Sequence, residues 1–252
     1  MAMRMAATAT LAVAFALTSC GVPQRVANPP AAGQSEEYDQ AIRAAAVRSP
    51  DWSMPLRSLG TGSVLTVGTF TTYDLDTRNY YVWVSIPAQL WELCKGKQDA
   101  ILSIQQILGL PPQPDDPQHP WHIILFQVDR STVFRPCPGG MDPQAPPDAP
   151  RCLAGNDLDP HLDKEIAHFL LNQFWIAHHV TFESEGKTKF GYPWTGMGWT
   201  YDWDPESKAH VGVSEFVVKK GTEVNKRTVT SLTPVAFCSA PKPPGDEASS
   251  AE

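Results

Sequence analysis

Four cysteines in the central and C-terminal parts of the chain constrain its fold more than any other feature. They are Cys94, Cys137, Cys152 and Cys238. An even number of cysteines is typical of disulfide-bonded exported domains, and four of them allow three pairings. The segment between Cys137 and Cys152 has no periodic pattern and many prolines, so it needs a cross-link to hold a defined shape. We therefore expect a Cys137–Cys152 disulfide, which leaves Cys94 to pair with Cys238.

The chain begins MAMRMAATATLAVAFALTSC, in which one basic residue precedes a run of small and apolar residues. The run is too short to span a bilayer as a stable helix, and its layout is typical of a secretory signal peptide. Its last four residues, Leu17-Thr18-Ser19-Cys20, resemble the lipobox of bacterial lipoproteins. The resemblance implies cleavage before Cys20, acyl chains on that residue and a durable membrane anchor. The alternative is an ordinary signal peptide that contains a cysteine.

The predicted organisation follows from the ends of the chain. Gly21 directly follows the cysteine, and the lipoprotein resemblance then implies the outer membrane, facing the periplasm, rather than the inner membrane. Residues 1–19 are the signal peptide, 20–50 a flexible tether, 51–239 a single domain and 240–252 a disordered tail. A domain of that length can bury a sizeable core by itself.

Charge and cysteine spacing exclude several classes of function. The chain has 27 acidic and 20 basic residues, which gives a formal net charge of −7 at pH 7. Because Lys and Arg are dispersed, we do not expect nucleic acid as a partner. The sequence has neither a CxxC motif nor the cysteine spacing of a zinc ribbon. We therefore predict no cofactor.

Hydrophobic patterns predict strands and helices in the first part of the domain. Two β-rich runs, 64–73 and 80–86, surround a polar segment and predict a hairpin. Apolar residues at three- and four-residue steps predict two helical pieces between 88 and 108, after Pro87. The run 122–128 is apolar on both faces, which is typical of a central strand. Val133 and Phe134 are expected to begin a short partner strand.

The second part of the domain contains the clearest helix, LDKEIAHFLLNQFWIAHHV, which Asp159 or Asp163 can cap. Strand-like runs follow at 187–192, 211–219 and 228–237. Strands first, helices inserted and strands last predict an α+β fold with a mostly antiparallel sheet. We expect one disulfide-linked domain with two inserted helical segments.

Three polar residues have a spacing that a metal site could use. His161, Glu165 and His168 stand at i, i+4 and i+7, so a helix running from His161 would direct them the same way. Polar residues at this spacing more often form a solvated helix face, and the HExxH order of zinc hydrolases is absent. We therefore assign no metal and keep these residues only as candidates.

The segment GYPWTGMGWTYDW, residues 191–203, concentrates five aromatic rings and three glycines. In a strand, Trp199, Tyr201 and Trp203 share one face, where they form either core or an exposed platform for a partner. We expect a mixture, with Tyr201 packed inside against the helix of Phe169 and Trp175. Trp194 and the Gly196–Gly198 bend would form an exposed contact edge, and Asp202 would face solvent or line the site. The candidate binding residues are Tyr192, Trp194, Trp199, Tyr201, Asp202 and Trp203.

This aromatic segment, with residues 211–218, is similar to segments of uncharacterised secreted or lipid-anchored proteins of proteobacteria, which implies an envelope module without a known activity. We predict a lipid-anchored cell-envelope protein with a non-catalytic binding or inhibitory role towards another macromolecule, either an envelope protein or a toxin-like protein. The alternative is a periplasmic hydrolase acting on cell-wall material. An enzyme should show a cleft where His161, Glu165, His168 or Asp202 converge, whereas a binder should show an apolar patch.

Overall fold

The computed structural model describes residues 35–47, 52, 54–154, 157–178, 182–184, 187–189 and 191–243. The predicted signal peptide, the lipidation site Cys20 and most of the predicted tail lie outside these residues. In the part of the chain that is described, none of the helices combines the length and the hydropathy that a membrane crossing requires.

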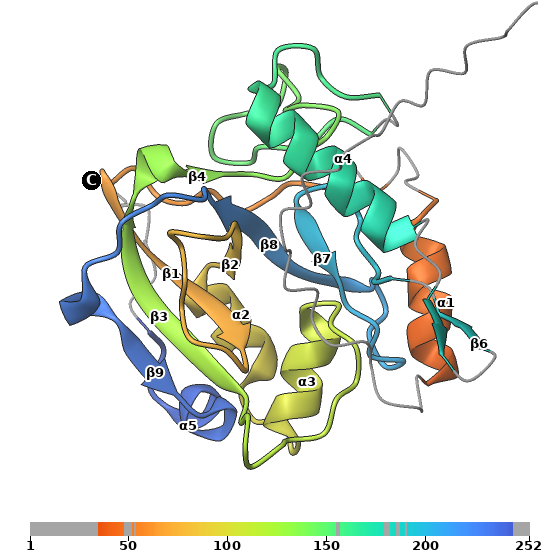
Figure 1. Cartoon of the computed structure of the whole chain (residues 1–252), viewed down its shortest axis with the longest axis vertical. Helices are drawn as coiled ribbons and strands as arrows, with labels where there is room; N and C mark the ends of the chain where they lie inside the picture. The colour runs from red at the N-terminus through yellow and green to blue at the C-terminus, as the bar shows by residue number, and fades with distance from the viewer. Residues whose placement is uncertain are drawn as a thin grey trace, which may run out of the picture.

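An antiparallel sheet of seven strands organises the fold (Figure 1). Six strands follow the order β4-β8-β2-β1-β3-β9, and β7 pairs with β8 outside this path. The bounds are β1 Val64–Thr71, β2 Val82–Ser85, β3 His122–Asp129, β4 Val133–Phe134, β7 Trp199–Tyr201, β8 Val211–Val218 and β9 Thr230–Leu232. A separate hairpin joins β5 Phe182–Ser184 to β6 Lys187–Lys189. The predicted α+β class with a mostly antiparallel sheet is confirmed.

The predicted hairpin and the predicted central strand are both present. β1 and β2 pair at Gly68, which lies opposite Ser85. β1 also pairs with β3 along its whole length, from Val64 opposite Asp129 to Thr71 opposite His122. β3 therefore lies between β1 and β9, and β2 lies between β1 and β8.

Helices α2 Pro87–Cys94 and α3 Ala100–Ile107 are the two predicted helical pieces. Gly96 separates them with a φ of 75°, a conformation that glycine adopts without strain, and the side chain of Asp99 caps α3. Both helices pack with α5 Pro234–Ser239 against one face of the sheet. Phe70, Leu90, Ile104, Ile123, Val213 and Phe237 form the core between them.

Both predicted disulfides are present. Cys94 of α2 is joined to Cys238 of α5, with a Cα–Cα distance of 5.6 Å. Cys137 is joined to Cys152 across a loop, with a Cα–Cα distance of 5.5 Å. The second bridge closes the proline-rich segment, whose ends also meet through backbone hydrogen bonds from Leu153 N–H to the carbonyl of Gly140 and from Asp142 N–H to that of Arg151.

The prediction of one continuous strand at 228–237 is wrong. Only Thr230–Leu232 forms a strand, β9, and Pro234 begins the short helix α5. The side chain of Thr233 caps this helix by accepting a hydrogen bond from the Ala236 backbone N–H. A threonine followed by proline is a typical helix start, and the β-branched residues around it concealed that signal.

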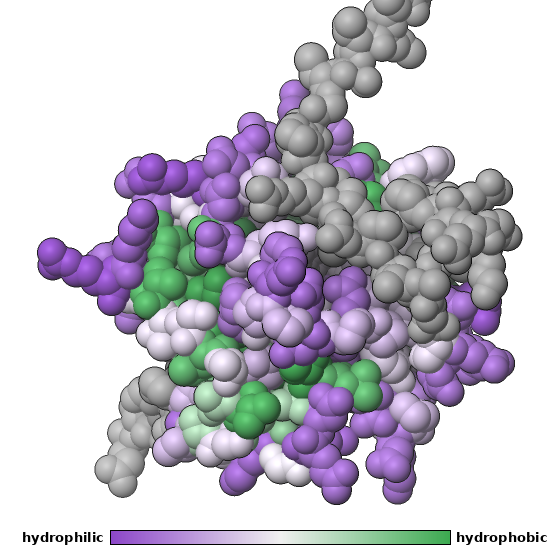
Figure 2. Space-filling view, turned by 60° about the horizontal axis from the view of Figure 1, so that its bottom comes forward, coloured by the Kyte–Doolittle hydropathy of each residue, from purple (hydrophilic) through white to green (hydrophobic). Residues whose placement is uncertain are grey.

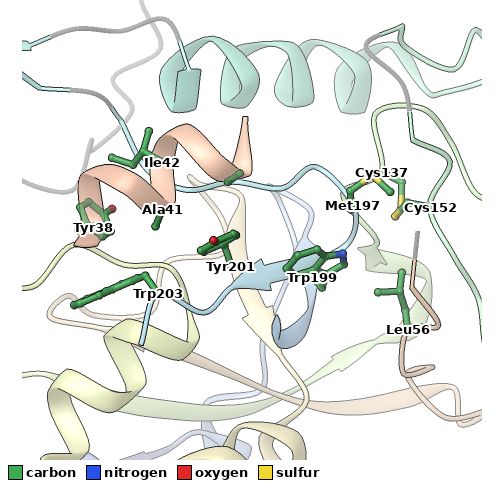
Figure 3. Packing of buried hydrophobic residues seen from close by; sticks show 11 residues of the cluster. Tyr38, Ala41, Ile42, Leu56, Cys137, Cys152, Met197, Trp199, Tyr201 and Trp203 are labelled. Atoms are coloured by element: carbon green, nitrogen blue, oxygen red, sulfur yellow. A yellow bond between two sulfur atoms is a disulfide. The ribbon is translucent and has the colours of Figure 1, made fainter. Parts of the chain in front are cut away.

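The prediction that residues 20–50 form only a flexible tether is also wrong, because Glu36–Ala45 forms helix α1. Ser35 caps the helix through a hydrogen bond from the Tyr38 backbone N–H. Tyr38, Ala41, Ile42 and Ala45 recur at helical spacing and are all buried. Figure 3 shows this apolar stripe packed towards Tyr201 and Trp203. The folded body therefore includes a helix that precedes the predicted domain boundary.

Helix α4, Lys164–His178, is the predicted long helix, and Asp163 caps it by accepting hydrogen bonds from the backbone N–H groups of Glu165 and Ile166. Its buried residues are Phe169, Leu170, Gln173 and Ala177. Val180, the last residue of the predicted helix, lies outside the described residues. The helix packs beside Trp83, Trp194 and Val217, over the side of the sheet near β7 and β8 (Figure 1).

Candidate functional site

The aromatic segment 191–203 is buried rather than exposed. Trp194 is 3% exposed, Trp199 3%, Tyr201 7% and Trp203 5%, and both glycines of the Gly196–Gly198 bend are buried. The prediction that Trp194 and this bend form an exposed contact edge is therefore wrong. Gly198 has a φ of 74°, and a Cβ there would lie 2.8 Å from the Sγ atom of Cys152. A glycine is needed here so that the backbone can lie close to the disulfide. It does not make room for a ligand.

The rings of Trp199, Tyr201 and Trp203 pack against the N-terminal part of the chain. The ring of Tyr38 lies 5.5 Å from that of Trp203, edge to face. Trp52 lies 5.8 Å from Trp199, centroid to centroid. We predicted that Tyr201 packs against α4, but its neighbours are helix α1, as Figure 3 shows, and the rings of Trp52 and His210. These three candidate binding residues are core.

Asp202 is only 9% exposed, so the prediction that it faces solvent is wrong. Its carboxylate accepts a hydrogen bond from the Asp204 backbone N–H, and its own backbone N–H donates to the carbonyl of His210. Burial raises the pKa of Asp202, the hydrogen bond from Asp204 opposes that shift, and Lys97 opposes it more weakly. Asp202 holds a turn and does not line the cavity described below.

His161, Glu165 and His168 do not share a helix face, because α4 begins only at Lys164. His161 lies in the preceding turn, where its backbone N–H donates to the Asp159 carboxylate. Within the described residues, no group of three or more His, Cys, Asp or Glu side chains could hold a metal ion. Glu165 and His168 both line the cavity, but His161 does not.

A cavity of about 1610 Å³, partly open to solvent, is the candidate site that the described residues form. The β1–β2 hairpin, α4 and the segments 108–111, 118–122 and 191–194 surround it. On the face that Figure 2 shows, hydrophobic residues form several groups between polar ones. The cavity, and not an exposed apolar patch on that face, is therefore the feature to interpret.

Four neighbouring aromatic rings line one side of this cavity, and we call them its aromatic wall: Tyr81, Trp83, Phe169 and Trp194. Tyr81 stacks on Phe169 with the centroids 4.3 Å apart, Phe169 lies 5.9 Å from Trp83, and Trp83 lies 6.0 Å from Trp194. The rings come from the hairpin, from α4 and from the start of the aromatic segment. Phe169 and Trp194 are buried, whereas Tyr81 and Trp83 are partly exposed. Tyr81 and Trp83 therefore present ring surface to the cavity.

Glu215 and Ser85 form the polar floor of the cavity. They lie directly opposite each other on β8 and β2, so their side chains are neighbours on one face of the sheet. Both are buried, at 6% and 4% exposed, and both line the cavity. The Trp194 indole N–H donates to Glu215 Oε1 over 3.0 Å. One ring of the wall is thus fixed to the floor.

Burial raises the pKa of Glu215 from 4.5 to about 8, against the opposing effects of the Trp194 hydrogen bond and the positive charge of Arg135. The carboxyl group is therefore mostly protonated at neutral pH and can donate a hydrogen bond. A buried carboxyl group with a strongly shifted pKa, beside a cavity, is typical of functional sites.

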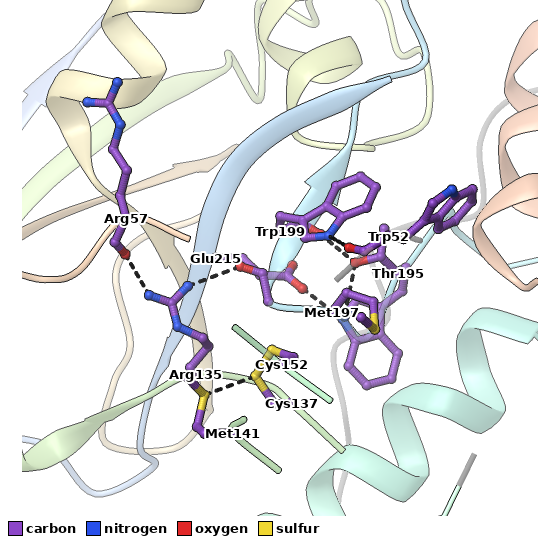
Figure 4. The surroundings of a disulfide bond; sticks show 12 residues. Trp52, Arg57, Arg135, Cys137, Met141, Cys152, Thr195, Met197, Trp199 and Glu215 are labelled. Atoms are coloured by element: carbon purple, nitrogen blue, oxygen red, sulfur yellow. Dashed lines mark hydrogen bonds between the residues drawn. A yellow bond between two sulfur atoms is a disulfide. The ribbon is translucent and has the colours of Figure 1, made fainter. Parts of the chain in front are cut away.

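Arg135 is a buried cation whose charge acts on Glu215 in the floor of the cavity. Its guanidinium donates to the carbonyl of Gly198 over 3.2 Å and to that of Arg57 over 2.6 Å, and lies 4.2 Å from the ring centroid of Phe216 (Figure 4). Burial lowers the pKa of Arg135 to about 10, although the charge of Glu215 raises it. Arg135 therefore stays positively charged and ties the Gly198 bend to the rest of the body.

Gln173 and Tyr192 add a second polar pair to the cavity lining. The Tyr192 hydroxyl donates to Gln173 Oε1 over 2.7 Å. Burial, and secondarily the Glu215 charge, raise the pKa of Tyr192, so its hydroxyl stays neutral. Tyr192 and Trp194 are the two candidate binding residues that the structure does place at the cavity.

Sequence reasoning missed Glu215, Ser85, Trp83 and Tyr81. A signal for Glu215 exists, since it is the one charged residue in the apolar run 211–218. A charged residue in a buried strand is rare and invites a functional explanation. Tyr81, Trp83 and Ser85 alternate within the predicted hairpin, which places them on one face, but only the partner elements show that this face borders a cavity.

No family model matches the chain, and no curated protein or solved structure is detectably similar to it.

Proposed function

We propose that the chain is a lipid-anchored protein of the cell envelope with a non-catalytic binding role towards another macromolecule, part of which enters the cavity. The cavity with its aromatic wall is the observation that carries this proposal. Its volume of about 1610 Å³ exceeds the roughly 300–1,000 Å³ that is typical of pockets for small ligands. Partly exposed Tyr and Trp rings supply large rigid contact area of the kind that dominates binding energy.

The hydrogen bonds around the cavity favour binding over catalysis. Among the described residues, no serine or threonine hydroxyl that lines the cavity is hydrogen-bonded to a histidine or a carboxylate. Activation of a hydroxyl nucleophile requires such a partner. An inhibitory role towards an envelope protein or a toxin-like protein, predicted from the sequence, stays a prediction.

A photo-crosslinking experiment tests the binding role. The full chain would be produced with p-benzoylphenylalanine in place of Tyr81, which lines the cavity, and in a control in place of Trp175, which is 58% exposed and does not line it. We expect illumination of intact cells to give an adduct from the Tyr81 position only. Absence of an adduct from a folded, correctly located Tyr81 variant, or equal adducts from both positions, would contradict the proposal.

The membrane anchor rests on the Leu17-Thr18-Ser19-Cys20 motif, and we propose the outer membrane, facing the periplasm, as its location because Gly21 follows. Several acyl chains on Cys20 would hold the mature protein durably. We expect the wild-type chain to sediment with membranes and Cys20→Ser to be released or to stay unprocessed. An unlipidated, freely soluble wild-type protein would exclude the anchor without affecting the cavity.

One observation favours a second candidate, a hydrolase of cell-wall material. A protonated Glu215 could act as a general acid at neutral pH, and Glu165 lines the same cavity. Glycoside hydrolysis needs two carboxyl groups about 5–10 Å apart. If the wild-type protein releases soluble fragments from purified cell-wall material and Glu215→Gln does not, the hydrolase replaces the binding role.

A further inference from the structure

β2 and Tyr81, the residue directly before it, place two rings and a hydroxyl in one row at the cavity. Tyr81, Trp83 and Ser85 alternate along the chain, so their side chains project to the same side. All three line the cavity. Phe169 backs Tyr81 by stacking, and the Trp194 ring meets Trp83 edge to face. The rings of Tyr81 and Trp83 are thus held in place while part of each remains accessible.

The floor, formed by Ser85 and Glu215, lies at the end of this row. Its side chains can form hydrogen bonds with a ligand and carry no net charge while Glu215 is protonated. The Ser85 hydroxyl can donate and accept, and the protonated Glu215 carboxyl can donate while Oε1 accepts from Trp194. Within the described residues, Trp194 is the one group that hydrogen-bonds to the Glu215 carboxyl. The remaining hydrogen-bonding capacity of Ser85 and Glu215 is available to a ligand.

This combination selects among ligand classes. A lipid acyl chain would cover the rings but would leave the buried polar groups of Ser85 and Glu215 without partners, which costs free energy. An anionic group would bring an unpaired charge into a buried part of the cavity, because Ser85 and Glu215 offer it no positive charge. β2 pairs with β8 along its whole length but with β1 only at Ser85, opposite Gly68, so an extended peptide added beside β2 is the occupant that a glycan must be tested against. Sugar rings fit, because they have apolar C–H faces for aromatic rings and hydroxyl groups for the floor.

We infer that the cavity binds an uncharged glycan chain, with sugar rings against Tyr81 and Trp83 and sugar hydroxyls on Ser85 and Glu215. This inference rests on the proposed binding role of the cavity and names its ligand class. An extended protein segment is the competing occupant, and the test below separates the two.

The probe is a soluble, uncharged tetrasaccharide of N-acetylglucosamine, titrated into the full mature chain in detergent. Trp83 and Trp194 line the cavity, so intrinsic tryptophan fluorescence reports occupancy. We expect a saturable change, an affinity at least about tenfold lower in Trp83→Ala, and an unchanged affinity in Trp175→Ala, which removes a tryptophan outside the cavity.

Tyr81→Ala provides a second test in case Trp83→Ala does not fold, since Tyr81 is partly exposed. It should weaken the tetrasaccharide affinity while the circular dichroism spectrum stays unchanged. No saturable change in wild type, or equal affinities in wild type and in both ring variants, would overturn the glycan inference.

The crosslinked adduct separates failure of this inference from failure of the proposed function. If the Tyr81 position crosslinks to a second polypeptide and the tetrasaccharide does not bind, the glycan inference is wrong and the binding role stands. If neither the tetrasaccharide nor a crosslinked partner is found, both are wrong. An adduct that glycan-degrading enzymes convert back to the free chain would support both.

Discussion

Residues 199–203 and residues 81–83 each place aromatic rings at alternate positions, but the two segments use them differently. The rings of Trp199, Tyr201 and Trp203 are at most 7% exposed, because α1 and the segment around Trp52 cover them. The rings of Tyr81 and Trp83 contact Phe134, Phe169 and Trp194 but stay partly exposed, and they line a cavity. A high density of aromatic residues therefore marks the core here, whereas the accessible rings lie in a less conspicuous strand.

The largest expected effect is loss of stability in the core segment. Trp199→Ala would leave a void in the cluster that Trp199 forms with Trp52, Leu56 and the Cys137–Cys152 bridge, so we expect the free energy of unfolding to fall by about 3–5 kcal/mol. Urea unfolding of wild type and variant measures it, with Trp175→Ala, at an exposed site, as the control. A Trp199→Ala cost no larger than that of Trp83→Ala would abolish the distinction between the two segments.

Removal of the loop disulfide should have the next largest effect. Simultaneous Cys137→Ala and Cys152→Ala changes free a loop of sequence separation 15, and the entropy of the unfolded chain then predicts a loss of about 3 kcal/mol. Because Gly198 lies against this bridge, the loss should be accompanied by a change in the near-ultraviolet signal of Trp199. The tetrasaccharide affinity should change much less, and a loss of binding equal to that in Trp83→Ala would show that the two segments are not independent.

The pH dependence of stability should distinguish the cavity floor from the core. The Glu215 pKa is raised to about 8 in the folded state, so between its ordinary value and pH 8 the folded chain binds more protons than the unfolded chain. The contribution of Glu215 to the free energy of unfolding is therefore complete below about pH 4.5. It is lost as the pH approaches 8, at up to about 1.4 kcal/mol per pH unit.

Glu215→Gln should remove this decrease of the free energy of unfolding with rising pH. Urea unfolding at about pH 5 and about pH 8 is the measurement, and the variant should gain stability relative to wild type at the higher pH. A wild-type slope that the substitution leaves intact would place the titrating group elsewhere, with Asp202 as the next residue to substitute because burial also raises its pKa.

The smallest expected effect is on stability at the aromatic wall. Tyr81→Ala loses the stacked contact with Phe169 and part of one ring's burial, so we expect a decrease of about 1–2 kcal/mol. Thermal and urea unfolding would measure it. A loss as large as that of Trp199→Ala would mean that Tyr81 is a core residue, and the cavity would then lose one of its two accessible rings.

Much of the fold could be predicted because local patterns and tertiary packing agree there. The hairpin of β1 and β2, the break between α2 and α3 at Gly96, and the cap of α4 at Asp163 all follow from adjacent residues. Both disulfides followed from the proline-rich composition of one loop. Helix α1 was missed because its apolar stripe lies in a segment with the composition of a linker.

The candidate site could not be predicted to the same extent because it is formed by separate elements. The cavity brings together Tyr81, Phe169, Trp194 and Glu215, which belong to four segments far apart in sequence. The Glu215 pKa depends on burial by neighbours that no local pattern reveals. The Gly196–Gly198 bend was predicted as a contact edge, but a glycine beside aromatic rings permits the close approach of any atoms. At Gly198 those atoms include the Sγ atom of Cys152 in the Cys137–Cys152 bridge.

The docking of helix α1 sets how far the body can lie from a membrane. With the lipid on Cys20, as proposed, only about 15 residues separate the anchor from Ser35, where α1 is capped. Even a fully extended chain of that length spans no more than about 50 Å, roughly half the reach of a tether that continued to residue 51. The start of α1 would therefore stay within that distance of the bilayer surface, so a ligand of the cavity would have to come within that distance plus the width of the folded body.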